Sequence, residues 1–157
     1  IEDEDNAGTV PDKLMNVGSG LVLKTVQAIV EDNVIESPQS TVDRPQLKHA
    51  PKIYKETCLI DWHTSALEIH NLIRGLSPYP SAFTHLDGKV LKIFAARISP
   101  INSREAVDSG LLSIDLSTDN KTYFSIKCFD GWLDILELQL EGKKRMKVDE
   151  FLRGHKF

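Results

Sequence analysis

The apolar residues of this chain change their spacing once, from the period of a helix to the period of a strand. Residues 64–76 carry apolar side chains three and four positions apart, which predicts a helix that Thr64 or Ser65 caps. Pro78 and Pro80 follow this segment and end the helical pattern. Beyond them apolar and polar residues alternate, so the remainder of the chain is constrained to short strands.

Five strands are predicted after the two prolines. Asp87-Gly88 and Asp130-Gly131 are turn pairs that join neighbouring strands, and a short helix over residues 148–153 follows the last strand. Five short antiparallel strands in so small a unit must curl or close to hide their edges. The pattern therefore predicts a small five-stranded barrel of the oligonucleotide-binding (OB) type. Its strands are expected at residues 82–86, 89–98, 112–117, 122–128 and 132–140.

The N-terminal part of the chain has a different pattern. Residues 12–31 approximate a helical apolar stripe with Asp12 as the expected N-cap, although Gly18 and Gly20 weaken its first turns. Residues 37–50 shift to Pro, Gln, Ser and Thr, and no apolar period survives there. The fold class predicted is thus mainly β with helices: an N-terminal helix and an extended linker precede a helix and the OB-like barrel.

The net charge of −4 is unevenly distributed along the chain. Residues 1–51 hold four basic and nine acidic groups, whereas residues 52–157 hold 15 basic and 14 acidic groups. This balance excludes a uniformly basic nucleic-acid binder. Four basic residues nevertheless fall within five positions, which indicates either a local positive field for phosphate or a solvated loop beside a strand. The cluster consists of Lys143, Lys144, Arg145 and Lys147.

Sequence patterns typical of catalysis or metal binding are absent. Cys58, His63 and His70 form a C-x4-H-x6-H array, which is not a usual zinc spacing. Cys128 lies on a predicted strand and is expected to be a buried small hydrophobe. No glycine-rich phosphate loop follows a strand, and no apolar run approaches the roughly 18–20 residues that span a bilayer. We expect no metal, no membrane segment and no active site in this chain.

Four segments carry a recognisable series of motifs. The most specific are IDWHTSALEIHNLIRGLSPYP at residues 60–80 and ILELQLEGKKRM at residues 135–146. LDGKVLKI at residues 86–93 lies between them, and DNAGTVPDKL at residues 5–14 comes first. In this order they resemble the C-terminal half of the methionyl-tRNA formyltransferase family. The resemblance covers nearly the whole chain and is weakest over residues 98–110 and in the linker.

The resemblance implies three regions. Residues 1–38 would be the C-terminal tail of the family's N-terminal catalytic domain, an α/β unit, and residues 39–56 a linker. Residues 57–157 would be the C-terminal OB-like domain that binds tRNA. The start at Ile1 would then lie inside a longer parent protein, expected to be a cytoplasmic monomer. Its expected partners are initiator methionyl-tRNA and its own upstream catalytic domain.

The resemblance also implies where the reaction takes place. In the family, the amino group of methionyl-tRNA attacks the formyl carbon of 10-formyltetrahydrofolate, assisted by an Asn, a His and an Asp of the N-terminal domain. The family's N-x-H segment and SLLP loop do not occur in this chain. We therefore expect no catalytic and no cofactor-binding residue here, with 10-formyltetrahydrofolate serving the full-length enzyme.

The resemblance implies that this chain binds tRNA through basic side chains that contact the tRNA phosphates. Lys143 and Lys144 lie on the matching family motif and rank first. An ordinary solvated side chain is the alternative for each candidate, and Lys144 or Lys147 could instead pair with Asp149 or Glu150. The candidates are Lys48, Lys52 and Lys55 in the linker, Arg74 at the end of the helix, and Lys89, Lys92, Lys143, Lys144, Arg145 and Lys147 in the barrel.

Two other functions remain open at this stage. One is the C-terminal barrel of a related formyltransferase that acts on a nucleotide sugar or on folate, in which the basic residues have no tRNA role. The other is a non-catalytic interaction barrel whose apolar face docks on a partner domain.

Overall fold

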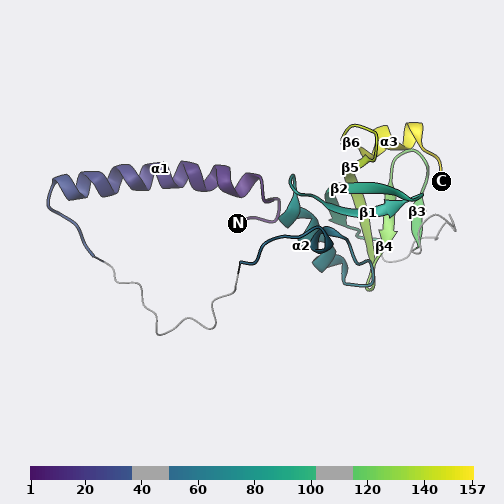
Figure 1. Cartoon of the computed structure of the whole chain (residues 1–157), viewed down its shortest axis with the longest axis horizontal. Coiled ribbons are helices and arrows are strands. Elements are labelled where there is room, and N and C mark those ends of the chain that lie inside the picture. Colours follow the sequence, from purple (N-terminus) through teal and green to yellow (C-terminus); the bar gives the residue numbers. More distant parts are fainter. Residues whose placement is uncertain (37–49, 102–114) are drawn as a thin grey trace.

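The computed structural model describes residues 1–36, 50–101 and 115–157. Figure 1 shows a long helix, α1, that extends away from a compact unit formed by the strands and the other helices. No helix within these ranges is both long and apolar enough to cross a bilayer. The helices are α1 (Thr9–Val30), the single-turn 3-10 helix η1 (Glu56–Cys58), α2 (Ala66–Leu76) and α3 (Val148–Gly154).

The described strands form one antiparallel sheet in the order β1-β2-β5-β4-β3, and β6 pairs with β5. The predicted fold class is confirmed as strands accompanied by helices, although the sheet has six strands rather than five. Among the described residues no pairing joins β1 to β3, so closure into an OB-like barrel stays a prediction. The strands are β1 (Ala82–Leu86), β2 (Lys89–Ile98), β3 (Leu116–Thr118), β4 (Phe124–Lys127), β5 (Trp132–Leu140) and β6 (Met146–Lys147).

Three of the five predicted strands have the predicted boundaries. β1, β2 and β5 have the predicted bounds, whereas β4 is shorter than the predicted 122–128. Residues 112–114 of the predicted third strand lie outside the described residues, and β3 itself runs to Thr118. β6 was not predicted, because two residues are too few to show a period.

The β1–β2 hairpin turns at the predicted Asp87-Gly88 pair. Both residues have positive φ angles, 54° for Asp87 and 73° for Gly88. A two-residue hairpin of this kind needs such angles at both central positions, which glycine and aspartate tolerate best. The turn therefore fixes the register, in which Phe83 lies opposite Lys92.

Helix α2 begins at Ala66, two residues later than predicted, and Ser65, one of the two predicted caps, is its N-cap. The Ser65 hydroxyl accepts from the Glu68 amide and the Glu68 carboxylate accepts from the Ser65 amide, which is a complete capping box. The Ala66 amide is satisfied differently, by Asp130 Oδ1 at 2.8 Å from the turn before β5. Ile69 and Ile73 are buried on the face that packs on β2.

A continuous apolar core joins the sheet, α2 and α3. Trp62 and Thr84 contribute a buried hydrogen bond from indole Nε1 to hydroxyl Oγ1 at 3.1 Å, between the segment before α2 and β1. Phe151 and Leu152 bury one side of α3 against this core. The core thus lies wholly in the C-terminal unit, which carries the predicted barrel.

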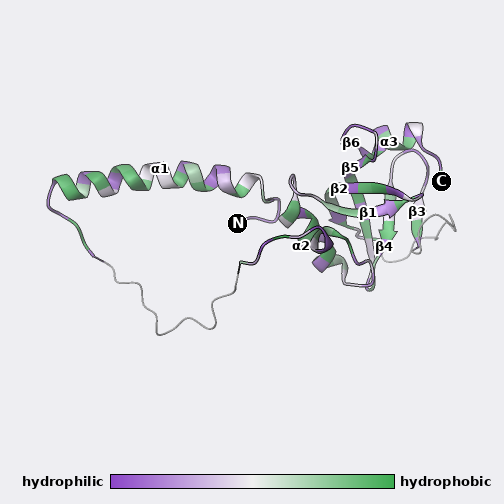
Figure 2. Ribbon diagram, in the orientation of Figure 1, coloured by the Kyte–Doolittle hydropathy of each residue, from purple (hydrophilic) through white to green (hydrophobic). Residues whose placement is uncertain are grey.

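Helix α1 has no buried residue along its 22 positions. Figure 2 shows hydrophobic residues along most of its length. The expected N-cap Asp12 is wrong: the helix begins at Thr9 after Gly8, and Asn6 Oδ1 accepts from the amides of both residues. Asp12 instead lies in the first turn, where a carboxylate still favours the positive end of the helix dipole.

The chain before α1 docks on the end of α2. The Ala7 amide donates to the Arg74 carbonyl and the Gly8 amide to the Ser77 carbonyl, at 3.0 and 3.1 Å. A Cβ atom at Gly8 would lie 2.7 Å from Cδ of Pro78, so this approach requires glycine. The N-terminal helix is therefore anchored at its root to the C-terminal unit, as Figure 1 shows beside the N label.

Candidate nucleic-acid interface

The outward face of β1, β2 and β5 carries the first group of candidate residues. Phe83 on β1 lies opposite Lys92 on β2, which lies opposite Gln139 on β5. Opposite residues of antiparallel strands point to the same side, and the flanking Leu91 and Ile93 are fully buried on the other side. Lys92 is consequently exposed at the middle of this outer face.

A tight turn between β5 and β6 carries the first residues of the basic cluster. The Lys143 amide donates to the Leu140 carbonyl at 2.9 Å, and Gly142 has a φ angle of 77°, which favours glycine. The Gln139 amide Nε2 donates to the Lys143 carbonyl at 2.8 Å. Beyond the turn Lys147 lies opposite Glu137 of β5. Lys147 therefore lies on the same face as Lys92, with β5 between their strands, whereas Lys143 lines a pocket with Glu150 and Phe151 of α3.

Arg145 is held rigidly inside the cluster. Its Nε and Nη2 donate to the two carboxylate oxygens of Glu137 at 2.7 and 2.6 Å, and this pairing raises the pKa of Arg145. The guanidinium carbon lies 4.3 Å from the ring centroid of Phe94, a cation–π distance. Arg145 thus neutralises Glu137 and covers Phe94, and it has less free charge to offer a phosphate.

The three lysines of the cluster differ in their partners. Lys144 Nζ lies 3.0 Å from Glu150 Oε1, which confirms the predicted pairing for Lys144. Within the described ranges Lys143 and Lys147 have no ion-pair partner, so the predicted pairing of Lys147 is not observed. Both side chains are exposed. They are the members of the cluster whose charge is least compensated.

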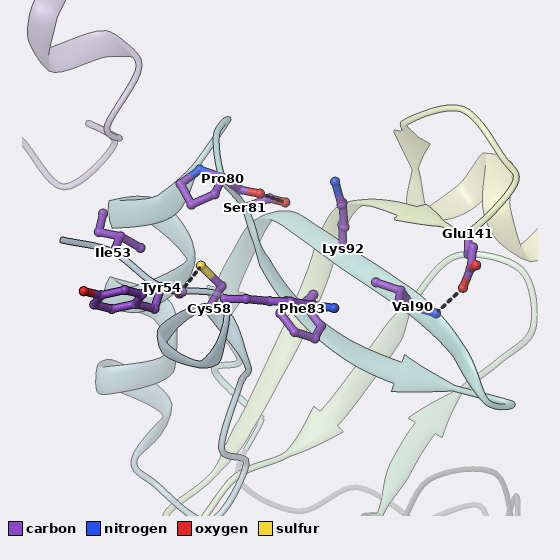
Figure 3. A pocket seen from close by; sticks show the side chains of 10 residues that line it. Ile53, Tyr54, Cys58, Pro80, Ser81, Phe83, Val90, Lys92 and Glu141 are labelled. Atoms are coloured by element: carbon purple, nitrogen blue, oxygen red, sulfur yellow. Dashed lines mark hydrogen bonds between the residues drawn. The ribbon is translucent and has the colours of Figure 1, made fainter.

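The linker candidates lie beside the outer face, at β1. Lys55 Nζ lies 6.0 Å from the ring centroid of Phe83, and Lys52 Nζ lies 5.6 Å from that of Tyr54. Figure 3 shows Tyr54, Phe83 and Lys92 around one pocket of about 500 Å³. Lys48 lies outside the described residues.

The two remaining candidates have other surroundings. Lys89 is exposed at the start of β2, next to the hairpin turn. Arg74 Nη1 donates to the carbonyls of Glu2, Asp3 and Asp5, at 3.2, 3.3 and 3.3 Å. Its guanidinium is therefore occupied by the N-terminal segment.

The residues considered for metal binding or nucleophilic chemistry have structural surroundings. Cys58 is buried and donates to the Tyr54 carbonyl at 3.4 Å, and burial lowers the pKa of His70, as does nearby Arg74. Cys128 is buried as predicted, and burial followed by the charge of Asp130 raises its pKa to about 11. Among the described residues no three His, Cys, Asp or Glu side chains are grouped to hold a metal ion.

Sequence reasoning missed the aromatic side chains of this region. Tyr54, Phe83 and Phe94 come from the linker, β1 and β2, and only the fold brings them beside the lysines. A signal was available in the segment Lys52–Lys55, where two lysines flank a tyrosine in a region otherwise predicted to be plain linker.

Comparison with known proteins identifies the class of this fold. The model of the formyl transferase C-terminal domain family matches residues 52–156. The chain belongs to this family. A methionyl-tRNA formyltransferase of Phocaeicola vulgatus is 46% identical over 163 residues, which cover 99% of this chain and 48% of the relative. The chain spans about half the length of the curated relatives it matches and corresponds to their C-terminal part.

Solved structures show the same fold at low sequence identity. HypX from Aquifex aeolicus superposes with a TM-score of 0.62 at 15% identity, over 98% of this chain and 27% of HypX. The sugar 3N-formyl transferase WlaRD, solved with dTDP and 5-N-formyl-THF, gives 0.55 at 18% identity over 92% of this chain and 47% of WlaRD. At these identities the likeness shows the fold alone.

Proposed function

We propose that this chain is the tRNA-binding C-terminal part of a methionyl-tRNA formyltransferase. Its similarity to enzymes of that name extends over essentially the whole chain. The parent enzyme would transfer the formyl group of 10-formyltetrahydrofolate to the amino group of methionyl-tRNA for translation initiation, in the cytoplasm and as a monomer. The catalytic and folate-binding groups would belong to its other domain, and this chain would hold the tRNA.

One observation carries the tRNA role: cationic side chains gather around β5 and the turn that follows it, while the chain as a whole is acidic. Lys92 on β2 and Lys147 on β6 lie on the two strands that flank this part of β5, and Lys143 is in the turn between β5 and β6; none has an ion-pair partner among the described residues. Lysines distributed in this way can follow the phosphates of a nucleic acid without reading its bases. Net charge alone would not have suggested such a surface.

The exposed helix α1 supports the proposed division of the chain. Its large apolar residues are exposed; Leu14, Leu21 and Ile29, for example, are 60–65% exposed. A helix of this composition needs a partner surface to bury it. We assign residues 1–38 to the catalytic domain of the parent, which would supply that surface, residues 39–56 to the linker and residues 57–157 to the tRNA-binding domain.

The salt dependence of tRNA binding tests the proposal. Affinity of the 157-residue chain for initiator tRNA is measured by filter binding between about 50 mM and 0.5 M salt. Each phosphate contact adds about 0.9 to the slope of log K against log salt in duplex regions. Lys143→Ala and Lys147→Ala are each expected to weaken binding and to reduce the slope by roughly one contact.

The matched control is Lys121→Ala, an exposed lysine between β3 and β4 that is not among the candidates. It should leave both affinity and slope unchanged. Undiminished binding at about 0.5 M salt, or an unchanged slope in both cluster variants, would contradict the tRNA role. Equal affinity for heparin and tRNA would favour the nucleotide-sugar or folate class of formyltransferase instead.

A further inference from the structure

A pocket of about 500 Å³ opens between the segment before η1 and the β1–β2 hairpin. This volume lies within the roughly 300–1,000 Å³ typical of small-ligand sites. Figure 3 shows Tyr54 at one end, Glu141 at the other, and Phe83 and Lys92 between them. Lys92 also belongs to the outer face described above, so the pocket is continuous with the proposed tRNA surface.

Aromatic rings supply the walls of this pocket. The Tyr54 ring is on the surface, with 58% of the residue exposed, and the Phe83 ring is partly buried against the core. Ring faces of this kind are platforms on which unpaired nucleobases stack, because every base presents a π-face. A base inside a duplex is stacked on its neighbours on both sides, so it has no free face to offer such a ring.

Cations accompany both rings. Lys52 lies over Tyr54 and Lys55 over Phe83, and Lys92 lines the same pocket. The single carboxylate among its lining residues, Glu141, accepts from the Val90 amide at 3.0 Å. Because Glu141 lies at the end away from Tyr54, a phosphate is favoured at the lysine side.

We propose that this pocket binds one unstacked nucleotide of the tRNA, with its base against Tyr54 and Phe83 and its phosphate beside Lys55 and Lys92. The proposal rests on the tRNA-binding function proposed above and adds to it a site for single-stranded nucleotide. The surface lysines would hold duplex phosphates, and the pocket would select a place where the tRNA is not paired.

Short RNA probes separate the pocket from the rest of the surface. The 157-residue chain is titrated with a single-stranded tetranucleotide, with an abasic tetranucleotide of the same charge, and with a blunt RNA duplex. Tyr54→Ala is expected to weaken the tetranucleotide about 5- to 100-fold, the range of one base–aromatic stack, and to leave the duplex unchanged. Tyr54→Phe keeps the ring and should restore the affinity.

Matched variants and the abasic probe decide the outcome. Tyr79→Ala removes a more exposed tyrosine that does not line the pocket and should change nothing. Lys55→Ala should weaken both single-stranded probes, because it removes a phosphate contact rather than a stack. Equal binding of the abasic and natural tetranucleotides, or no effect of Tyr54→Ala, would overturn the proposal.

The pocket proposal and the proposed function can fail separately in these experiments. If Tyr54→Ala is silent while Lys143→Ala and Lys147→Ala still weaken tRNA binding, the pocket proposal fails and the tRNA role stands. If the cluster variants and the salt series show no electrostatic binding of tRNA, the proposed function fails whatever the tetranucleotide does.

Discussion

Arg74 Nη1 donates to the main-chain carbonyl of Asp5 over 3.3 Å, across 69 positions of sequence. The same nitrogen reaches the carbonyls of Glu2 and Asp3, and the Arg74 carbonyl accepts from the Ala7 amide. One residue at the end of α2 therefore closes the N-terminal segment into a turn and fixes the root of α1. The Gly8 amide adds a hydrogen bond to the Ser77 carbonyl, so Arg74 and Ser77 together hold the start of α1 on the end of α2.

Removal of the Arg74 contacts is expected to loosen the N-terminal segment without unfolding the C-terminal unit of sheet, α2 and α3. In Arg74→Ala, three carbonyls lose a charged donor, and hydrogen exchange at the Ala7 and Gly8 amides should accelerate about tenfold, as expected from roughly 1–2 kcal/mol of local stability. The urea midpoint of the C-terminal unit should hardly move. Arg153→Ala, which removes an exposed pair with Asp149, is the control and should not affect these amides.

Acid should release the same segment over a defined pH range. The Asp5 carboxylate accepts from Lys13 Nζ and from the Glu2 amide, and these contacts lower its pKa from 3.8 to about 2. A carboxylate whose pKa is lower in the folded form stabilises that form while ionised. The stabilisation is complete above about pH 4 and disappears as the pH falls to about 2.

Chemical shifts of residues 2–13, followed from pH 6 to pH 2, measure this release. Asp5→Asn removes the titrating group and should abolish the transition in that segment. Asp149→Asn removes another carboxylate with a lowered pKa, next to Arg153, and should leave the transition in place. A transition that persists in Asp5→Asn contradicts the assignment.

Breaking the buried hydrogen bond between Trp62 and Thr84 should lower the free energy of unfolding by more than one hydrogen bond normally contributes, because a buried donor is left unpaired. Thr84→Val keeps the shape of the side chain but leaves indole Nε1 without its acceptor in the core, which should cost about 1–3 kcal/mol of unfolding free energy. Urea unfolding measures the loss. Trp62→Phe removes the donor, so adding Thr84→Val to it should be nearly neutral, and full additivity would exclude the bond.

Local patterns predicted the parts of this fold that local forces determine. The hairpin at Asp87-Gly88 and the cap at Ser65 each depend on a few adjacent residues, and both were predicted correctly. The cap at Asp12 was wrong because the Asn6 side chain, three residues before Thr9, already accepts from the first free amides. Propensity favoured the aspartate, but the actual start of the helix was set by a neighbouring turn.

Contacts between distant segments could not be predicted in this way. The Asp130 carboxylate caps Ala66 from 64 positions away, and the pocket between Tyr54 and Phe83 exists only because the linker returns to β1. Likewise, charge clustering located the lysines after β5, but not their differing partners. Glu137 is eight positions from Arg145 in sequence, and only the pairing of β6 with β5 brings their side chains together.

Because the residues of the basic cluster have different partners, we expect their substitutions to differ in their effects on stability and on tRNA binding. Arg145→Ala leaves Glu137 without its partner and uncovers Phe94, so it should lower stability by about 1 kcal/mol. Its effect on the salt slope of tRNA binding should be smaller than that of Lys147→Ala, whose charge has no partner among the described residues. Urea unfolding and the salt series, run on the same two variants, check both halves of the prediction.

Glu150→Gln releases Lys144 from its carboxylate and should raise tRNA affinity about two- to threefold at low salt. Screening by salt should remove this effect by about 0.5 M. A loss of affinity in Glu150→Gln, or equal slopes for Arg145→Ala and Lys147→Ala, would show that the ion pairs do not decide which cations meet the phosphates.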